Sequence, residues 1–280
     1  MPRPHPESPV QAVKDLLQTL ARARVYDLGR PLEAATPVSP NHPPFRMALM
    51  RRHGDTIRAD GTTGANELLT MGGHTGTHID ALAHVAVHGR LHGGLDAAEA
   101  SRGGRFRELG VDTIEPILAR GVLLDVPRSL GCERLEAAHP VTADELARTA
   151  REQETEPAEG DVVLVRTGWP VDTYGSGAAY AGHESGVPGP DVSAARWLSE
   201  RKIRATGADT LAYEWVAAGA GHSLLPVHSH LLVEAGIHIL EVLDLEALAS
   251  DRVHEFLFVA IPLKLVGATG SPIRPLAVVV

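Results

Sequence analysis

Four side chains that can bind a metal ion lie within one short segment of this sequence. His74, His78, Asp80 and His84 follow the spacing H-x3-H-x-D-x3-H inside GHTGTHIDALAH. Imidazole nitrogen and carboxylate oxygen are ligands that both Zn²⁺ and Mn²⁺ accept in proteins. Five of the chain's 15 histidines fall between residues 74 and 92, and ordinary surface or core histidines do not explain that concentration. The pattern therefore predicts a divalent metal site.

The spacing also indicates how these residues meet. His78 and Asp80 are two residues apart, so in a strand their side chains share one face. His74 and His78 are four apart, which places them on one side of a helix, but the neighbouring glycines favour a turn-rich loop that folds both rings round one ion. Thr75 and Thr77 of the same loop are candidates to orient ligands or to help hold an oxyanion.

Other common catalytic motifs do not occur in the chain. There is no HExxH metalloprotease motif and no GxSxG nucleophile elbow. The single cysteine, Cys132, cannot make an intrachain disulfide, and we expect it to be a partly buried structural thiol rather than a nucleophile. One reduced cysteine fits a cytoplasmic protein.

Composition bounds the class of protein and its partners. The chain has 280 residues, 44% of them hydrophobic and 22% charged, which is typical of a globular protein with a sizeable core. Its formal net charge is −9 without a dense run of Lys or Arg, which argues against nucleic acid and anionic membranes as partners. The apolar runs are shorter than the roughly 20 residues that span a bilayer, and the start is polar and proline-rich, so we expect no secretory signal. A small-molecule substrate is the expected partner.

The elements that must position the histidines follow from hydrophobic periodicity. We predict helices over Val10–Arg24, Asp112–Gly121, Thr142–Glu152, Asp191–Arg201 and His228–Ala235, with Gly236 as the glycine that ends the last one. Strands are expected at 25–28, 121–126, 161–169, 202–210, 237–243, 256–266 and 275–280. The proline-rich segment 31–45 is expected to be a loop, and 170–190 a functional loop. Because several strands follow one another without a helix between them, we predict a mixed α/β single domain.

Beyond these patterns, the chain resembles the cyclase family, which includes bacterial kynurenine formamidase and isatin hydrolase. HTGTHIDALAH is similar to the family signature H-x-G-T-H-x-D-x-P-x-H, although Leu82 stands where the formamidases commonly carry proline. VYDLGRPL, GVLLDV, VVLVRTGW, GADTLAYE, LPVHSHLLVEAGIHILEVLDLEAL and IPLKLVGATGSPIRPLAVV resemble further family blocks in the family's order. The resemblance covers nearly the whole chain beyond Val25. It implies a helical extension over residues 1–24 and one hydrolase domain over 25–280, with the swivelling β/β/α architecture and assembly as a homodimer or homotetramer.

The resemblance also implies roles for individual residues. His74, His78 and Asp80 match the first metal-binding group of the family, and Asp80 can bridge to a second ion whose other ligands match His228 and Glu241. His84 matches the catalytic histidine. His228 and His230 both lie near Glu241 in the sequence, and only the PVHSHLL context favours His228.

The expected activity is hydrolysis of a small amide or cyclic amide, with one or two Zn²⁺ or Mn²⁺ ions activating water and His84 shuttling the proton. Two alternatives within enzymes are a metal-dependent cyclase or lyase, and a lactone hydrolase. A third alternative is a non-catalytic metal-binding protein, which a fully closed ligand set would favour. Trp169, Tyr213 and Trp215 are candidates to line a substrate pocket.

Overall fold

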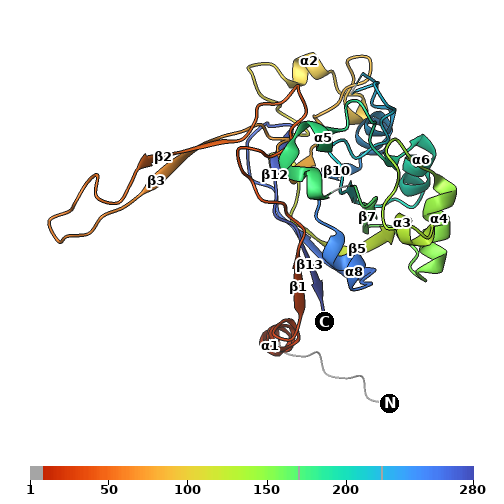
Figure 1. The fold of residues 1–280 in the computed structure, drawn as a ribbon, viewed down its shortest axis with the longest axis horizontal. Coiled ribbons are helices and arrows are strands. Elements are labelled where there is room, and N and C mark those ends of the chain that lie inside the picture. Colours follow the sequence, from red (N-terminus) through yellow and green to blue (C-terminus); the bar gives the residue numbers. More distant parts are fainter. Residues whose placement is uncertain (1–8, 170, 222) are drawn as a thin grey trace.

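The computed structural model describes residues 9–169, 171–221 and 223–280 (Figure 1). Its centre is one nine-stranded mixed sheet with the strand order β1-β13-β11-β5-β7-β9-β10-β4-β12. Strands β5, β7, β9 and β10 are parallel to one another, and the outer strands pair antiparallel. In sheet order the bounds are β1 Arg24–Asp27, β13 Leu276–Val279, β11 Glu255–Ala260, β5 Ile117–Asp125, β7 Val162–Arg166, β9 Ala205–Ala208, β10 His238–Glu241, β4 His78–Asp80 and β12 Gly270–Pro272.

Short helices and two small ribbons complete the fold. The ribbons are the antiparallel pair β2 (Arg46–Arg51) and β3 (Asn66–Thr70), and the parallel pair β6 (Pro140–Val141) and β8 (Gly189–Pro190). The helices are α1 Pro9–Leu20, α2 Ala97–Ala100, α3 Val126–Ser129, α4 Ala143–Glu152, α5 Ala178–Ala181, α6 Val192–Glu200, α7 Pro226–His228 and α8 Glu246–Ser250, with 3₁₀ turns η1 His92–Gly94, η2 Val111–Thr113 and η3 Val171–Ser176 and a π-helix η4 Ser229–Ala235. The predicted mixed α/β single domain is confirmed. Among the residues described, no helix is both long and apolar enough to cross a membrane.

The central strands bury both faces of the sheet. In β7, Val163 and Val165 pack into one core while Val162 and Leu164 pack into the other, as alternation along a strand requires. Helices α4, α6, α7 and η4 cover the first face, and α8 covers the second (Figure 1). Burial on both faces explains why VVLV, residues 162–165, is a continuous apolar run instead of an alternating one.

Several local predictions are confirmed. Thr142 caps α4 through a complete capping box with Glu145. Asp191 accepts a hydrogen bond from the backbone of Ala194 at the start of α6. Gly236 ends η4 in the left-handed conformation, with φ of 71°. The proline-rich segment 31–45 contains no regular helix or strand.

Other predictions are wrong. The helix expected from Asp112 to Gly121 is only the 3₁₀ turn η2, because Pro116 interrupts it and the following residues pair with β7 and β11 as β5. The first helix ends at Leu20 instead of Arg24, which begins β1. The strand expected through residue 266 ends at Ala260. Cys132 is exposed instead of partly buried, and it lies in the loop that follows α3.

The division into an extension over 1–24 and a domain over 25–280 stays a prediction. Residues 1–8 of that extension, and residue 170 of the predicted functional loop, lie outside the described residues.

Candidate metal centre

The centre is built on β4, a strand of three residues held between two partners. His78 and Asp80 point to the same side of β4, and Ile79, which is fully buried, points to the other. Antiparallel pairing with β10 places Glu241 directly opposite His78, so these two side chains share a face. On its other edge β4 pairs with β12. The predicted common face of His78 and Asp80 is therefore confirmed, and Glu241 lies on the same face.

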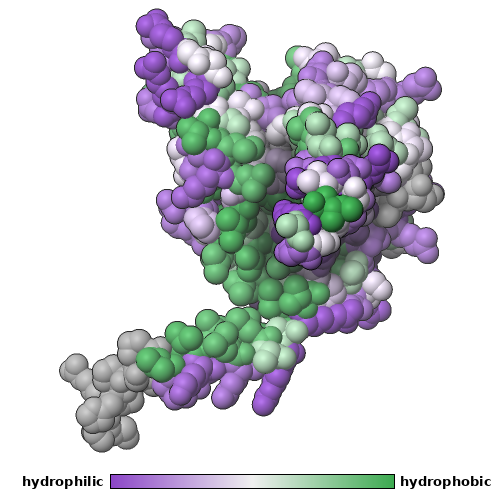
Figure 2. Space-filling model, turned by 90° about the vertical axis from the view of Figure 1, so that its left-hand side faces the viewer, coloured by the Kyte–Doolittle hydropathy of each residue, from purple (hydrophilic) through white to green (hydrophobic). Residues whose placement is uncertain are grey.

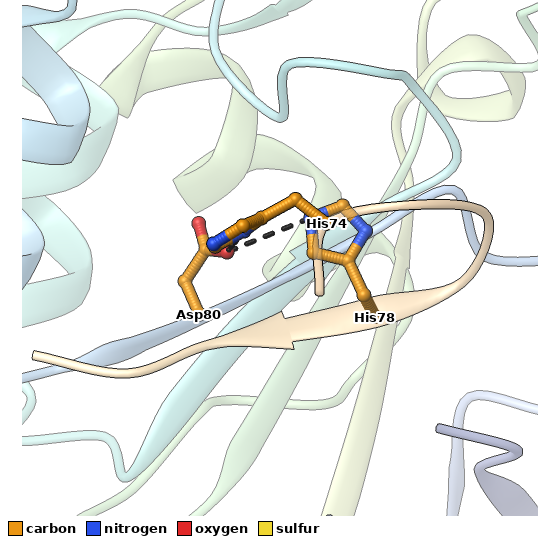
Figure 3. Close-up of side chains that lie close together, drawn as sticks. All are labelled: His74, His78 and Asp80. Atoms are coloured by element: carbon orange, nitrogen blue, oxygen red, sulfur yellow. Dashed lines mark hydrogen bonds and ion pairs between the residues drawn. The ribbon is translucent and has the colours of Figure 1, made fainter. Parts of the chain in front are cut away.

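His74 reaches the same point from the glycine-rich loop before β4 (Figure 3). Its Nδ1 lies 2.7 Å from Oδ1 of Asp80, and its Nε2 lies 2.9 Å from the Thr269 hydroxyl. The loop turns at Gly76, whose φ of +67° and close approach to Leu32 leave no room for a side chain. The turn-rich loop predicted for this segment is confirmed.

His228 completes the cluster from the end of α7. Its Nε2 lies 3.2 Å from Oε1 of Glu241 and 3.6 Å from Oδ2 of Asp80. Its other ring nitrogen, Nδ1, donates a 2.6 Å hydrogen bond to Glu214, whose carboxylate also accepts from the backbone of Val227 and His228. Glu214 thus fixes the direction of the ring and leaves Nε2 facing the two carboxylates.

These residues fit a divalent cation. Two overlapping groups, one of His74, His78 and Asp80 and one of Asp80, His228 and Glu241, each bring their ligand atoms within 4.8 Å of one another. Asp80 belongs to both groups. Its Oδ2 is buried and makes no hydrogen bond to any described residue, which a cation would remedy. Buried imidazole and carboxylate donors are the ligand set that Zn²⁺ and Mn²⁺ accept.

The charges in the cluster are strongly coupled. Burial alone raises the pKa of Asp80, but the surrounding His84, His74 and His78 outweigh it and hold that pKa well below its usual range. Burial lowers the pKa of His78, but Glu241 and Asp80 more than reverse the effect and raise it to about 9. In the same way, hydrogen bonds to Glu214 and Glu241 overcome the burial of His228 and raise its pKa to about 10. The carboxylates are therefore anionic at neutral pH, and protons occupy positions that a cation would take.

His84 belongs to neither ligand group. Its ring stacks on His74 with the ring centroids 4.0 Å apart, and it lies 6.3 Å from the ring of His228. Burial, opposed by Asp80 and assisted by His74, lowers the pKa of His84 to about 4. At neutral pH this imidazole is uncharged and able to accept a proton.

A cavity of about 390 Å³ opens onto the cluster. Its lining includes four cluster residues and His84, together with apolar and polar neighbours. The apolar neighbours are Val85, Ala86, Leu211, Ala212 and Leu225, and the polar ones are Ser39, Asn41 and His42. The aromatic residues proposed for a pocket lie elsewhere. The indole of Trp169 donates to Tyr180, the Tyr213 hydroxyl bonds to Thr206, and the indole of Trp215 donates to Ala138.

The structure separates candidates that the sequence left together. His230 lies outside the cluster, where its ring bonds to Ser199 and Glu234. The hydroxyl groups of Thr75 and Thr77 donate to the backbone carbonyls of Pro43 and Val242, so both serve to hold loops together.

Two residues of the site were missed in the sequence. His42 lies in the proline-rich loop with its ring 5.0 Å from that of His74, and its only signal was a histidine between prolines in PNHPP. Glu214 gave one signal as well, an acidic residue within the apolar stretch LAYEWV.

Comparison with known proteins finds relatives in one family. The model of the Cyclase family matches residues 26–215. The chain is 27% identical over 227 residues to the isatin hydrolase of Roseibium aggregatum, covering 79% of this chain and 77% of that protein. It is 27% identical over 252 residues to the kynurenine formamidase of Geobacillus thermodenitrificans, covering 89% of this chain and 94% of that protein.

Solved structures show the same relationship. A structure described as a novel cyclase matches with a TM-score of 0.83 at 27% identity, over 97% of this chain and 93% of the other. An isatin hydrolase bound to the product analogue thioisatinate matches with a TM-score of 0.73 at 26% identity, over 98% and 99%. The family match spans more than half of the chain and includes His74, His78, Asp80 and His84. This chain therefore belongs to the cyclase family.

Proposed function

We propose that this protein is a metal-dependent hydrolase of a small amide or cyclic amide. The observation that carries the proposal is the convergence of the metal-binding side chains beside a cavity, with His84 next to them and outside both ligand groups. These side chains are His74, His78, Asp80, His228 and Glu241, of which all but Asp80 line the cavity. An amide substrate is supported by the relatives, an isatin hydrolase and a kynurenine formamidase.

The cluster residues would hold one or two Zn²⁺ or Mn²⁺ ions, with Asp80 shared between the two groups. A divalent ion supplies Lewis acidity and lowers the pKa of water from about 15.7 toward ~7. His84 takes the proton of the attacking water as the carbonyl carbon is attacked, and returns it to the leaving nitrogen as the C–N bond breaks. Because His84 is uncharged at neutral pH, it begins the reaction in the form that accepts a proton.

The cavity indicates the character of the substrate. About 390 Å³ accommodates a small molecule, and the lining combines apolar side chains with the polar side chains of the cluster. The same arrangement serves a lactone, whose carbonyl is attacked in the same way, and a lyase or cyclase reaction in which His84 moves a proton. A purely structural metal site, in which protein ligands fill every coordination position, is less well supported. Four of the cluster residues line a cavity, which leaves space for a substrate beside the ion.

The experiment combines metal analysis with turnover. We expect purified protein to hold stoichiometric Zn or Mn, and the metal-free and refilled forms to differ in hydrolysis of isatin, N-formylkynurenine and a small lactone. In His84→Ala we expect kcat to fall by about 10²- to 10⁴-fold with metal content unchanged. His230→Ala is the matched control and keeps both turnover and metal.

Each other outcome has a definite meaning. If His84→Ala loses its metal, His84 is a ligand, and this result favours the hypothesis of a non-catalytic metal-binding protein. If it keeps full turnover, the assigned proton transfer is wrong. If purified protein binds no metal above background, the central proposal fails.

A further inference from the structure

A second cavity adjoins the residues that hold His74 in place. This rear cavity has a volume of about 390 Å³, lies between segments 101–106 and 267–270, and shares no lining residue with the cavity beside the cluster. The Thr269 hydroxyl, on its lining, lies 2.9 Å from Nε2 of His74. Gly270 also lines it and lies so close to the ring that a Cβ there would be 2.5 Å from Cε1. The rear cavity and the metal centre are therefore separate spaces that meet at one candidate ligand.

The rear cavity is built largely from backbone. The backbone N–H of Phe106 donates to the carbonyl of Gly267 over 3.0 Å, which joins the two segments. A Cβ at Gly267 would lie 2.4 Å from the carbonyl oxygen of Phe106, and at φ of +73° only glycine fits this contact without strain. Four of the lining residues are glycines, so a small ligand can approach the backbone closely.

Arg105 supplies the charge of the rear cavity, and no other described residue on its lining is charged. Its side chain is exposed and makes no ion pair with any described residue, whereas the neighbouring Arg102 pairs with Glu99. Three other cavities each include at least one carboxylate on their lining, among them Glu241 and Asp27. The rear cavity therefore combines a positive charge with the absence of an acidic side chain among its described lining residues.

The charge of this region contrasts with the rest of the molecule. The chain carries 35 Asp and Glu against 26 Lys and Arg, yet residues 101–107 hold three arginines and no acid. Figure 2 shows that one face carries a band of hydrophobic residues that continues along α1, and such a surface offers no charge to a small anion. One arginine and one hydroxyl suit the two oxygens of a carboxylate, whereas proteins commonly bind phosphate groups with clusters of arginines. The lining of the rear cavity therefore favours a small carboxylate.

The Thr269 hydroxyl links the rear cavity to His74. A hydroxyl has one hydrogen to donate and can also accept, and a neutral imidazole carries one N–H and one free lone pair. If the hydroxyl donates to Nε2, the ring hydrogen lies on Nδ1, which faces Asp80, and Thr269 has no hydrogen left for a ligand. If Nε2 donates to the hydroxyl instead, Nδ1 has a lone pair for a cation, and Thr269 can donate to an anion. A cation at Nδ1 and an anion at Thr269 therefore favour the same arrangement.

We propose that the rear cavity binds a small carboxylate through the Arg105 guanidinium and the Thr269 hydroxyl, and that this carboxylate strengthens metal binding by His74. Because coupling between two sites is reciprocal, a bound metal ion must strengthen carboxylate binding by the same factor. The coupling rests on the metal centre of the proposed function, whereas the carboxylate site does not. Hydrolysis of an amide by water releases a carboxylate and an amine, so one product of the proposed reaction has the chemistry that this site accepts.

Calorimetric titration of the metal-free protein with sodium acetate tests the carboxylate site, because acetate then has no metal ion to bind. We expect saturable binding, and Arg105→Gln should weaken it about tenfold, the lower end for a hydrogen bond to a charged group. Arg196→Gln is the matched control, because Arg196 is also exposed and makes no ion pair with a described residue. The carboxylate site is refuted by the absence of saturable binding, by wild-type affinity in Arg105→Gln, or by tighter binding of inorganic phosphate than of acetate.

Equilibrium dialysis against buffered free Zn²⁺, with and without saturating acetate, tests the coupling. We expect acetate to raise the Zn²⁺ affinity of the wild type at least about fivefold, the lower end of typical coupling factors. Thr269→Ser keeps the hydroxyl and should keep this ratio, whereas Thr269→Val has nearly the same shape and should lose it. Because the readout is the ratio of the two affinities, an effect of either variant on metal binding alone cancels.

The outcomes separate this proposal from the proposed function. A wild-type affinity that does not change with acetate would overturn the coupling, and so would equal ratios in Thr269→Ser and Thr269→Val. Circular dichroism checks that both variants are folded. A chain that binds no Zn²⁺ would refute the proposed function and the coupling, while the acetate titration would still decide whether the carboxylate site exists.

Discussion

Glu214 is the residue whose replacement tests the arrangement of the metal centre most directly. Glu214 is 1% exposed and is not among the residues that line the cavity beside the cluster. Its carboxylate accepts three hydrogen bonds. Two of these come from the backbone of Val227 and His228, and the third comes from Nδ1 of His228. The change Glu214→Gln keeps the size and one acceptor oxygen and removes the negative charge.

The expected cost follows from these contacts. A hydrogen bond to a charged group is worth about 1.5–3 kcal/mol and a neutral one about 0.5–1.5 kcal/mol, so the bond to Nδ1 weakens by about 1 kcal/mol. The amide NH₂ cannot accept from Val227, and that lost bond costs about 1 kcal/mol more. A total of about 2 kcal/mol corresponds to roughly 30-fold, inside the ~10–100-fold range for groups that orient metal ligands.

Equilibrium dialysis of the refilled protein against graded free Zn²⁺ measures this effect. We expect the affinity of the group Asp80, His228 and Glu241 to fall by roughly 30-fold, while the group that contains His74 and His78 keeps its affinity. His230→Ala is the control and should follow the wild-type curve, because its ring bonds to Ser199 and Glu234 instead. A Glu214→Gln curve that superimposes on wild type would refute the reasoning that Glu214 prepares His228 for a cation.

Two further predictions concern the same cluster. Because the pKa values of His78 and His228 are raised to about 9 and about 10, both rings are protonated at neutral pH without a cation, so metal binding must release protons and affinity must rise with pH. Metal affinity can be measured by chelator competition between about pH 7 and pH 9. A plot of the logarithm of this affinity against pH should have a slope approaching about two, and a flat plot would contradict the prediction. Separately, a Cβ added at Gly270 would lie 2.5 Å from Cε1 of His74, so Gly270→Ala should lower metal content in a folded chain, whereas Gly175→Ala, with nothing within 4 Å, should not. Equal metal in both glycine variants would show that the His74 ring can move without loss of binding.

Local patterns predicted the parts of the site that depend on neighbouring residues. The two-residue spacing placed His78 and Asp80 on one face of a strand, and the glycines around His74 indicated a turn instead of a helix. The same logic failed at Asp112, where a sequence suited to a helix start is followed by Pro116 and by the residues of β5, which pair with two strands, β11 and β7. Pairing in the sheet outweighed local propensity there.

The hairpin of β2 and β3 shows a different limit. Its strands are short runs, RMALMR and NELLT, and neither alternates cleanly between apolar and polar residues. A strand is recognised in a sequence by the single face that it buries, but here both faces of each strand remain largely exposed. This hairpin therefore has no clear strand signal in the sequence.

The remaining parts of the site depend on pairing between distant segments. Glu241 becomes a ligand candidate because β10 lies antiparallel to β4 in the register that sets it opposite His78. A shift of one residue would turn Glu241 to the opposite face of the sheet. Glu214 depends on the turn after β9 meeting the start of α7, and no periodicity in either segment encodes that meeting. The sequence thus shows which residue types could bind a metal. It does not show that Glu214 orients His228, because that contact exists only in the folded chain.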